Sequence, residues 1–364
     1  MAEVLREVTD ADLDAIEIGA AILGTGGGGN PYIGKLRCRE ELKKGRRIPV
    51  IPLAELPDDA LVVSLGGIGA PVVGVEKIEE GQECLRALRA IEKELGVKVD
   101  ALISAEIGGA NSMEPMLTAA QAGLPVVDGD GMGRAFPEMQ MCTWSIYGHR
   151  EAPGAMADEK GNIVVIRDTV DDVWLERIAR SVVVTMGAAA GLATQPMRGD
   201  FVKRAAVPNT ITQALNLGRA VLNAHKINAD PVQTVIDSER GRLLMTAKIV
   251  DLERHLKGGF AVGHLSLEDF GDFAGDTGRI ELQNEFLVFR RNGTVEVCTP
   301  DLIVVLDSDT GLPITTEMLR YGQRIAVLGL PAHPLMRSPE ALEVVGPAAF
   351  GYPDIIFKPM EDTP

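Results

Sequence analysis

The sequence is poor in cysteine, and its cysteines form no recognisable pattern. It has four in 364 residues, Cys38, Cys84, Cys142 and Cys298, with no Cys-x-x-Cys pair and no Cys/His cluster. Such spacing indicates neither a disulfide framework nor a structural zinc site. The five histidines are also scattered, with no His-x-His or His-Glu-x-x-His motif, so no metal site is predicted. We expect reduced thiols and a cytoplasmic protein.

Long apolar runs and an excess of basic residues are also missing. No stretch of 18 apolar residues occurs, which predicts no membrane span, and the first residues lack the basic-then-apolar order of a secretory signal. The net charge is −16. Because nucleic acids and anionic membrane surfaces bind basic patches, this charge disfavours both as partners. A small-molecule substrate stays open, because a local site can oppose the global charge.

Apolar runs alternate with helical patterns in the first part of the chain. Residues 60–65, 99–105 and 124–127 resemble strands, whereas 76–94 and 113–122 have helical periodicity. This alternation predicts an α/β domain at residues 1–165 with a mostly parallel sheet. The loops after the carboxyl ends of such strands converge on one crevice, so the Gly-rich loops that follow these runs should lie together.

The remainder of the chain changes character twice. Helical patterns at 170–186 and 208–224 predict a helical connecting region at 166–240, packed on the first domain. Short β runs with turn signals then predict a β-rich domain at 241–364, a barrel or sandwich with a hairpin turn at 292–293, whose tail returns to the first domain. The length is compatible with two or three domains, and we expect a homo-oligomer on general frequency.

Glycine is concentrated in the segment GTGGGGNPY at residues 24–32, which holds five glycines between two predicted helices. Glycine lets backbone N–H groups approach a ligand, and the N-terminus of the following helix favours an anion. Asn30 can cap that helix, and Pro31 suits its first position. The alternative is a tight helix–helix turn, which one or two glycines would serve. The substrate-binding assignments here are Gly26, Gly27, Gly28, Gly29 and Asn30.

Two later loops combine glycine with charged side chains. In EIGGANSMEP, Glu106 follows a predicted strand directly, and in DGDGMGRAFPE, Asp128 and Asp130 occupy alternate positions at a strand end and should face the crevice together. Paired carboxylates suit general acid–base work or cation binding, and Arg134 offers a planar fork for ligand oxygens. The catalytic assignments are therefore Glu106, Asp128, Asp130 and Arg134, and the further substrate-binding ones are Gly108, Gly109, Asn111 and Glu138.

Each of these assignments has a structural alternative. Glu106 could cap the following helix, the two aspartates could be turn residues, and Arg134 could pair with Glu138 at helical spacing. In the β-rich part, four polar residues lie on or beside β runs and could face the cleft, although a solvated strand face is the simpler interpretation. They are Glu281, Asn284, Glu285 and Asp301.

The three loops together, with the C-terminal segment TPDLIVVLDSDTGLPITTEMLRYGQRIAVLGLPAHPLM, resemble the S-methyl thiohydantoin desulfurase family, which is associated with hydantoinase and oxoprolinase proteins. The resemblance spans nearly the whole chain. It implies an α/β N-terminal domain, a β-rich C-terminal domain, and hydrolysis of an S-methylated thiohydantoin ring to a hydantoin and methanethiol.

The residues are compatible with that chemistry but leave alternatives open. A carboxylate can take a proton from the attacking water, and backbone N–H groups can stabilise the charge that develops on the ring. A hydantoinase-like cyclic amide hydrolase, a nucleotide-linked relative whose Gly loop binds phosphate, and a non-catalytic ligand-binding subunit of a hydantoinase-type complex are the alternatives. The use of a metal or nucleotide cofactor stays open.

Overall fold

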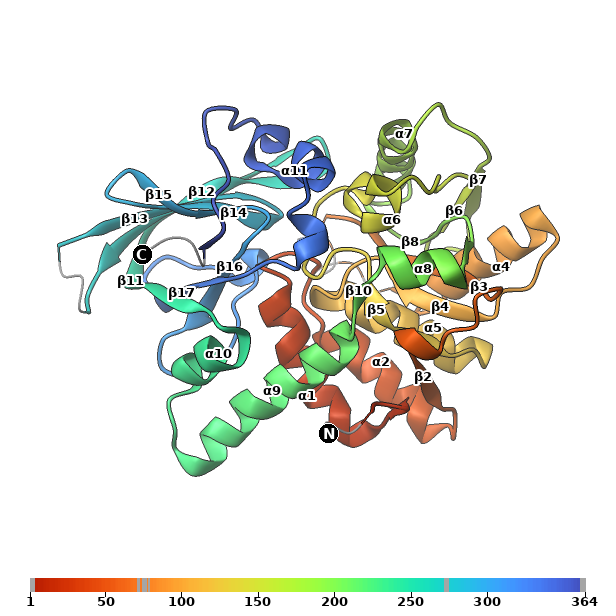
Figure 1. Cartoon of the computed structure of the whole chain (residues 1–364), viewed down its shortest axis with the longest axis horizontal. Helices are drawn as coiled ribbons and strands as arrows, with labels where there is room; N and C mark the ends of the chain where they lie inside the picture. Colours follow the sequence, from red (N-terminus) through yellow and green to blue (C-terminus); the bar gives the residue numbers. More distant parts are fainter. Residues whose placement is uncertain (1–3, 71–72, 74–76, 78, 272–274, 361–364) are drawn as a thin grey trace.

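The computed structural model describes residues 4–70, 73, 77, 79–271 and 275–360, and these residues form two β-sheets with helices packed on and between them (Figure 1). After the short strand β1 (Glu7–Val8), the chain runs as helix, Gly loop, helix, as predicted. Helix α1 (Asp10–Leu23) starts at a capping box in which the Thr9 N–H donates to Asp12 Oδ2 at 2.9 Å. Helix α2 (Tyr32–Lys43) starts directly after Pro31, and Asn30 Oδ1 accepts from the Tyr32 N–H at 2.9 Å.

The first sheet has a parallel centre with antiparallel additions. Its strand order is β1-β2-β5-β4-β3-β8-β6-β7, in which β2, β5, β4 and β3 are parallel neighbours and the remaining neighbours pair antiparallel. Short strands β9 (Met197–Arg198) and β10 (Val207–Pro208) pair with β3 and β5. The main strands are β1 (Glu7–Val8), β2 (Ile48–Pro52), β3 (Leu61–Gly69), β4 (Ala101–Ser104), β5 (Val126–Asp130), β6 (Gly154–Ala157), β7 (Ile163–Ile166) and β8 (Ala189–Ala193).

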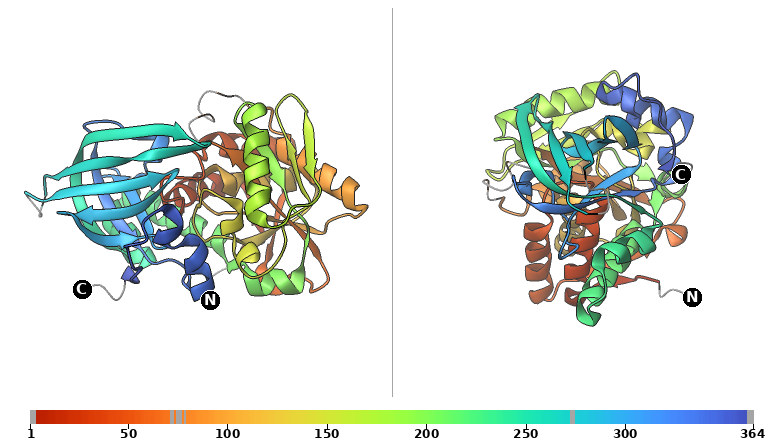
Figure 2. Two further views of the ribbon diagram at one scale, coloured as in Figure 1. Left: turned by 90° about the horizontal axis from the view of Figure 1, so that it is seen from above. Right: turned by 90° about the vertical axis from the view of Figure 1, so that its left-hand side faces the viewer.

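Several helices cover this sheet (Figure 2). Helix α5 contacts β2, β3, β4 and β5, α4 contacts β8, β6, β3 and β7, and α7 contacts β3, β7 and β8. Helix α9 lies along α1 between the two sheets, with α10 next to it (Figure 1). Their bounds are α4 (Glu83–Leu95), α5 (Met113–Ala122), α6 (Thr143–Ile146), α7 (Asp172–Thr185), α8 (Gly199–Ala205), α9 (Thr210–Ile227) and α10 (Pro231–Glu239).

The second sheet is wholly antiparallel, in the order β15-β14-β13-β12-β11-β17-β16. The sheet curls, so that β16 contacts β14 and β15 as well as its ladder partner β17. Asn292-Gly293 makes the predicted turn between β14 and β15. A separate apolar core is built mainly from residues of this sheet. Its strands are β11 (Arg242–Lys257), β12 (Phe260–Asp269), β13 (Thr277–Gln283), β14 (Glu285–Arg291), β15 (Thr294–Cys298), β16 (Leu302–Asp307) and β17 (Arg324–Leu330).

The last part of the chain lies against the first sheet's loops. Helix α11 (Pro339–Val345) contacts α6 and the 3-10 turn η3 (Met139–Met141), and the rings of Phe136 and Phe350 stack at 6.4 Å. The Tyr147 hydroxyl donates to the Leu335 carbonyl at 2.6 Å. These contacts join the end of the chain to the part that carries the Gly-rich loops.

Two local expectations are wrong. The glycines after Leu65 form no loop, because β3 continues to Gly69 through antiparallel pairing with β8. The segment 166–240 holds the helices α7, α8, α9 and α10, and in addition it supplies β8, β9 and β10 to the first sheet. The helix expected at 76–94 begins only at Glu83, and residues 76 and 78 lie outside the described residues. Each difference depends on a strand partner or a helix start that no local pattern marks.

Candidate functional site

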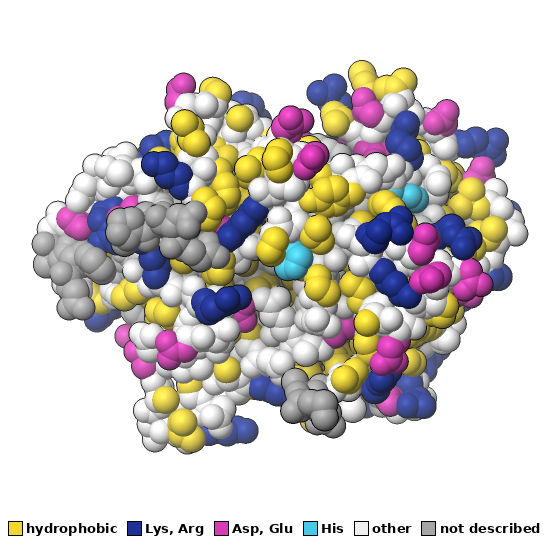
Figure 3. Space-filling view, viewed as in Figure 1, with side chains coloured by type: hydrophobic (Ala, Val, Ile, Leu, Met, Phe, Trp, Pro, Cys, Tyr) yellow, Lys and Arg dark blue, Asp and Glu magenta, His cyan; other side chains and the backbone are white. Residues whose placement is uncertain are grey.

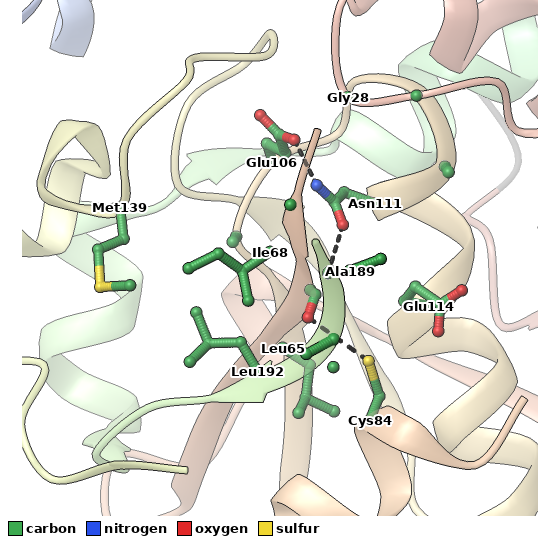
Figure 4. Close-up of a pocket in the computed structure, with 18 of the residues that line it drawn as sticks. Gly28, Leu65, Ile68, Cys84, Glu106, Asn111, Glu114, Met139, Ala189 and Leu192 are labelled. Carbon is green, nitrogen blue, oxygen red and sulfur yellow. Dashed lines mark hydrogen bonds between the residues drawn. The ribbon is translucent and has the colours of Figure 1, made fainter. Parts of the chain in front are cut away.

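A cavity of about 460 Å³ lies where the Gly loop, the extended end of β3 and the start of β14 meet. Its wall includes Gly28, Gly29 and Asn30 from the Gly loop, and Asn284 and Glu285 from the second sheet. The loop after β4 adds Glu106 and Asn111 (Figure 4). The loop after β5 adds Glu138. Segments that are distant in sequence therefore share one hollow, and it spans the junction of the two sheets.

Glu106 is held at the wall of this cavity by two donors. Its Oε1 accepts from the Asn111 side-chain amide at 2.5 Å, and its Oε2 accepts from the Phe136 backbone N–H at 3.0 Å. The Asn111 Oδ1 in turn accepts from the Gly67 N–H at 2.5 Å, so the glycine-containing end of β3 fixes the amide (Figure 4). The carboxyl of Glu106 does not cap a helix. It is one of the side chains that line the cavity.

Burial makes the Glu106 carboxyl a weak acid. The side chain is 5% exposed, and desolvation raises its pKa to about 7, with a smaller contribution from the charge of Asp130. The hydrogen bonds from Asn111 and Phe136 oppose this rise, because they stabilise the charged form. A carboxyl with a pKa near neutrality can take up and release a proton during turnover.

The Gly loop presses against the start of β14. A Cβ on Gly27 would lie 1.9 Å from Glu285 Oε1, and a Cβ on Gly28 would lie 2.2 Å from the Gly108 carbonyl oxygen, so both positions require glycine. Gly29 differs, since the nearest atom to a Cβ there is the Ala110 Cβ at 3.6 Å. Gly29 belongs to the cavity wall, and its N–H makes no hydrogen bond within the described residues. This N–H is an unpaired backbone donor at a residue that lines the cavity.

The second sheet contributes a deeply buried carboxyl, Glu285, to the cavity wall. It is 2% exposed, and within the described part of the chain its Oε2 has no hydrogen-bond partner. Desolvation raises its pKa well above the usual range, the charge of Glu106 raises it further, and Arg134 and the Gly28 N–H oppose the rise. Two buried carboxyls that influence each other therefore line the same hollow.

The cations of the cavity wall are already paired. Arg37 contacts Glu79 and lies 3.7 Å from Glu114, Lys77 lies 2.7 Å from Glu159, and Arg180 lies 2.7 Å from Glu176. Carboxyl groups outnumber these cations among the lining residues. The cavity consequently favours a neutral or cationic ligand over a phosphate or a carboxylate.

One side of the cavity is apolar. Ile68, Met139 and Leu192 lie together in Figure 4, on the other side of the Glu106–Asn111 pair from Glu114 and Cys84. Arg180 closes this side, since it donates to the carbonyl oxygens of Gly69 and Pro137 at 3.2 and 3.0 Å and lies over the Phe260 ring at 4.6 Å. A ligand with a polar ring and an apolar substituent matches these two sides.

Asp128 and Asp130 do not face the cavity together, and neither belongs to its wall. Asp128 accepts from the N–H groups of Ile211 and Thr212 at 2.9 and 3.1 Å, so it caps the start of α9. Asp130 accepts from the N–H groups of Ile107 at 2.8 Å and of Met132 at 3.1 Å. The pairing expected from alternate positions is wrong, because each carboxylate turns to a different set of backbone donors.

Arg134 does not offer its guanidinium to the cavity. It is 0% exposed, and burial lowers its pKa to about 10. All five of its N–H groups are used within the protein, which leaves no fork for a ligand, and it makes no pair with Glu138. Its acceptors are the carbonyl oxygens of Ala135, Phe286, Pro300 and Asp301 and the hydroxyl of Thr25. Arg134 thus joins the Gly loop to the second sheet.

The remaining predicted site residues divide into two groups. Gly26, Gly27, Gly108 and Gly109 lie behind the wall, where they let the Gly loop, the loop after β4 and the start of β14 approach closely. Of the β-domain candidates, Asn284 and Glu285 line the cavity, whereas Glu281 and Asp301 do not. Asp301 accepts from the N–H groups of Ala332 and Met360 and therefore anchors the last part of the chain.

Several cavity residues carry no sequence signal. Glu151, Glu176, Arg180 and Glu317 come from segments whose local sequence is that of ordinary amphipathic helices or loops. Glu285 had only the weak signal of an acidic residue at the start of a β run. These residues meet through the pairing of β3 with β8 and through the packing of the second sheet on the Gly loop.

The described residues offer no group of three or more His, Cys, Asp or Glu side chains arranged to hold a metal ion. None of the helices in the described ranges combines the length and apolar character that crossing a bilayer requires. On the face in Figure 3, Lys and Arg side chains lie among Asp, Glu and hydrophobic side chains, so the described part of that face presents no continuous basic field.

Comparisons with known proteins identify both halves of the chain. Residues 11–168 match the family described as S-Me-THD-like, N-terminal domain, and residues 170–360 match S-Me-THD-like, C-terminal domain. A comparison with curated proteins finds no match. The X-ray crystal structure of a protein from Chromobacterium violaceum is similar at 23% identity and a TM-score of 0.81, over 98% of this chain and 100% of that one. At this identity, the likeness shows a common fold.

Proposed function

Because the chain belongs to the S-Me-THD-like family, we propose that it hydrolyses an S-methyl thiohydantoin-like ring to a hydantoin and methanethiol in the cavity described above. The observation that carries the proposal is the setting of Glu106, a buried carboxyl with a pKa of about 7 at the wall of a cavity that is also lined by Gly29, whose N–H is unpaired within the described residues. This pairing of a proton acceptor with a backbone donor suits addition of water to an electrophilic ring carbon.

In the proposed reaction, Glu106 takes a proton from a water molecule as its oxygen attacks the ring carbon that bears the S-methyl group. Asn111 and the Phe136 N–H keep the carboxyl oriented during this step. Negative charge that develops on the ring is stabilised by backbone donors such as the Gly29 N–H, an effect typically worth about 2.7–4 kcal/mol per donor. Methanethiolate then leaves, and its moderate basicity reduces the need for a strong acid at sulfur.

The apolar side of the cavity suggests where the ring substituent lies. With the ring next to Glu106, a substituent would extend toward Ile68, Met139 and Leu192. We propose that a neutral, branched apolar group is preferred at that position. Each methylene group buried there would contribute about 0.8 kcal/mol to the free energy of binding. An unsubstituted ring should then show a higher KM than a ring bearing an isopropyl group.

Thiol release tests this proposal directly. Purified protein is incubated with an S-methyl thiohydantoin, and free thiol is measured over time without added nucleotide, with and without a chelator. Appearance of methanethiol and the hydantoin in equal amounts supports the proposal. The Glu106→Gln variant is the control for background hydrolysis, and equal rates for this variant and the unmodified protein would exclude Glu106 as the base.

Two other functions are distinguished by the products of the same assay. A ring-opened carbamoyl acid would identify a hydantoinase-like cyclic amide hydrolase, and binding without any product would identify a ligand-binding subunit of a hydantoinase-type complex. A nucleotide-linked reaction is less compatible with this cavity, because its cations are paired and the Gly28 N–H is already directed to Glu285.

A further inference from the structure

Neither packing nor the proposed role of Glu106 as the base explains why Glu285 is buried in the cavity wall. Its side chain forms part of the cavity wall at 2% exposure, and its Oε2 lacks a hydrogen-bond partner within the described ranges. A buried carboxyl oxygen without a partner costs free energy, and such groups occur where a ligand supplies the missing partner. Glycine at position 27 is required to make room for this side chain, since a Cβ there would lie 1.9 Å from Glu285 Oε1.

We infer that Glu285 is a second catalytic carboxyl, which hydrogen-bonds a ring nitrogen of the ligand and donates a proton to it while Glu106 accepts a proton from water. The inference rests on the proposed function for its chemical step, although the hydrogen bond to a ring nitrogen applies equally to a hydantoin that is only bound. The two carboxyls come from different sheets and line the same cavity. A small rotation of the terminal torsion of Glu285, which is soft, presents either oxygen to the ring.

The protons balance over one turnover. As the water oxygen bonds to the ring carbon, Glu106 takes one water proton, the C=N bond becomes a single bond, and Glu285 protonates that nitrogen. The C–S bond then breaks, and its electron pair leaves with sulfur. The remaining hydroxyl proton returns to Glu285 as the carbonyl forms, and Glu106 gives its proton to methanethiolate. One water is consumed, and both carboxyls regain their starting states.

The charges around Glu285 favour this assignment of roles. Glu106, from the loop after β4, raises the pKa of Glu285, and Arg134, from the loop after β5, lowers it. The Gly28 N–H of the Gly loop also lowers it, and the 3-10 turn η4 (Thr316–Met318) adds Glu317 to the same cavity wall. Burial is the largest cause of the raised pKa of Glu285, and the charge of Glu106 raises it further, so the two carboxyls do not ionise together. An acid and a base can then coexist in one cavity.

The kinetic test is the pH dependence of kcat/KM for thiol release. The unmodified protein should give a bell-shaped profile, which rises as one carboxyl of the pair ionises and falls as the second does. The Glu285→Gln variant keeps the shape and a hydrogen bond but cannot transfer a proton. It should lose the alkaline limb and lower kcat at least about tenfold with little change in KM. The matched control is Glu281→Gln on β13, outside the cavity, which should keep both limbs.

A binding test separates this inference from the reaction itself. Calorimetry compares 5-isopropylhydantoin with its N1-methyl and N3-methyl derivatives. In the unmodified protein, one methyl derivative should bind at least about tenfold more weakly, and this difference should vanish in Glu285→Ala, with thermal unfolding used to verify folding. If no thiol is released but this discrimination depends on Glu285, the proposed hydrolysis is wrong and the hydrogen bond from Glu285 to a ring nitrogen is supported. Thiol release with an unchanged profile and unchanged discrimination in the Glu285 variants overturns the inference.

Discussion

Asn111 stabilises the charged form of Glu106 through a hydrogen bond. Its Nδ2 donates to Glu106 Oε1 at 2.5 Å, and its Oδ1 is held by the Gly67 N–H at 2.5 Å, which fixes the orientation of the amide. This hydrogen bond lowers the pKa of Glu106 against the larger effect of burial. The pair therefore links the glycine-rich end of β3 to the ionisation of the proposed base.

Replacing Asn111 by alanine should move the acidic limb of the activity profile to higher pH. Loss of the donor destabilises the charged carboxyl, so the pKa of Glu106 should rise above its present value of about 7. At pH 7 the rate should fall, and at alkaline pH it should recover in part. The measurement is kcat/KM for thiol release between pH 5.5 and 9. A limb that stays in place would show that Asn111 does not tune this group.

Replacing Glu106 by glutamine should reduce kcat by about 100- to 10,000-fold, as expected for loss of a general base. The free energy of unfolding of this variant, in contrast, should rise relative to that of the unmodified protein as the pH becomes alkaline. A carboxyl whose pKa is about 7 in the folded state and 4.5 as its ordinary value binds protons more tightly when folded, so its contribution to stability falls as the pH rises through this window. The neutral amide avoids that loss.

Urea unfolding at pH 5 and pH 8 checks this second effect. The difference in stability between Glu106→Gln and the unmodified protein should shift in favour of the variant at pH 8. An equal difference at both values of pH would mean that Glu106 titrates alike in the folded and unfolded states, in contradiction to its burial.

The sequence predicts the alternating order of the first sheet well, because parallel strands and their helices carry strong local patterns. It also predicts that the loops after β4 and β5, which carry Glu106 and Glu138, lie near each other, since the carboxyl ends of parallel strands share one edge. It fails for Asp128, because the donors of this residue come from the start of α9, 83 positions later. Periodicity placed the aspartate at a strand end but could not show which backbone groups would meet it.

Arg134 illustrates a second limit. A charged residue in a glycine-rich loop is typical both of a ligand site and of a buried junction between domains. The position of the second sheet distinguishes these two roles, because three of the five acceptors of Arg134 belong to Phe286, Pro300 and Asp301. The sequence does not indicate that Glu285 lines the cavity, for the same reason. Its burial depends on the contact of β14 with the Gly loop, and its sequence neighbours say nothing about that contact.

Arg134→Met should destabilise the fold by at least about 3 kcal/mol, since several buried carbonyl oxygens would lose their donor. The aliphatic part of the side chain is preserved, so the loss reports the hydrogen bonds. Arg204→Met on α8 is the control, because the side chain of Arg204 is 67% exposed, and its effect should stay within about 0.5 kcal/mol. Chemical denaturation measures both. Similar midpoints for the two variants would contradict the role of Arg134 as a junction.

Asp128→Asn should leave kcat for thiol release unchanged, because this side chain does not reach the cavity. Asp128→Ala should instead lower the free energy of unfolding by about 1–2 kcal/mol, the usual cost of losing a helix cap. The two variants separate a catalytic from a capping role through one kinetic and one unfolding measurement. A large fall in kcat for the asparagine variant would restore Asp128 as a catalytic candidate.

Gly27→Ala should affect activity far more than Gly29→Ala, although both lie in the Gly loop. A Cβ at position 27 would overlap Glu285 Oε1 at 1.9 Å, so the loop or the Glu285 carboxyl has to move. At position 29 the nearest atom to a Cβ is 3.6 Å away, and the cost is the left-handed backbone, with φ of +78°. That conformation costs an alanine about 1–2 kcal/mol.

Gly45→Ala provides the matched control for this backbone cost. Its φ is +80°, and no described atom lies within 4 Å of a Cβ placed there. Gly29→Ala and Gly45→Ala should therefore lose similar stability in urea unfolding, whereas Gly27→Ala should in addition lower kcat for thiol release and weaken hydantoin binding. If Gly27→Ala behaved like Gly45→Ala in every measurement, the close contact between the Gly loop and Glu285 would not matter for the site. The glycines would then serve only to turn the chain between α1 and α2.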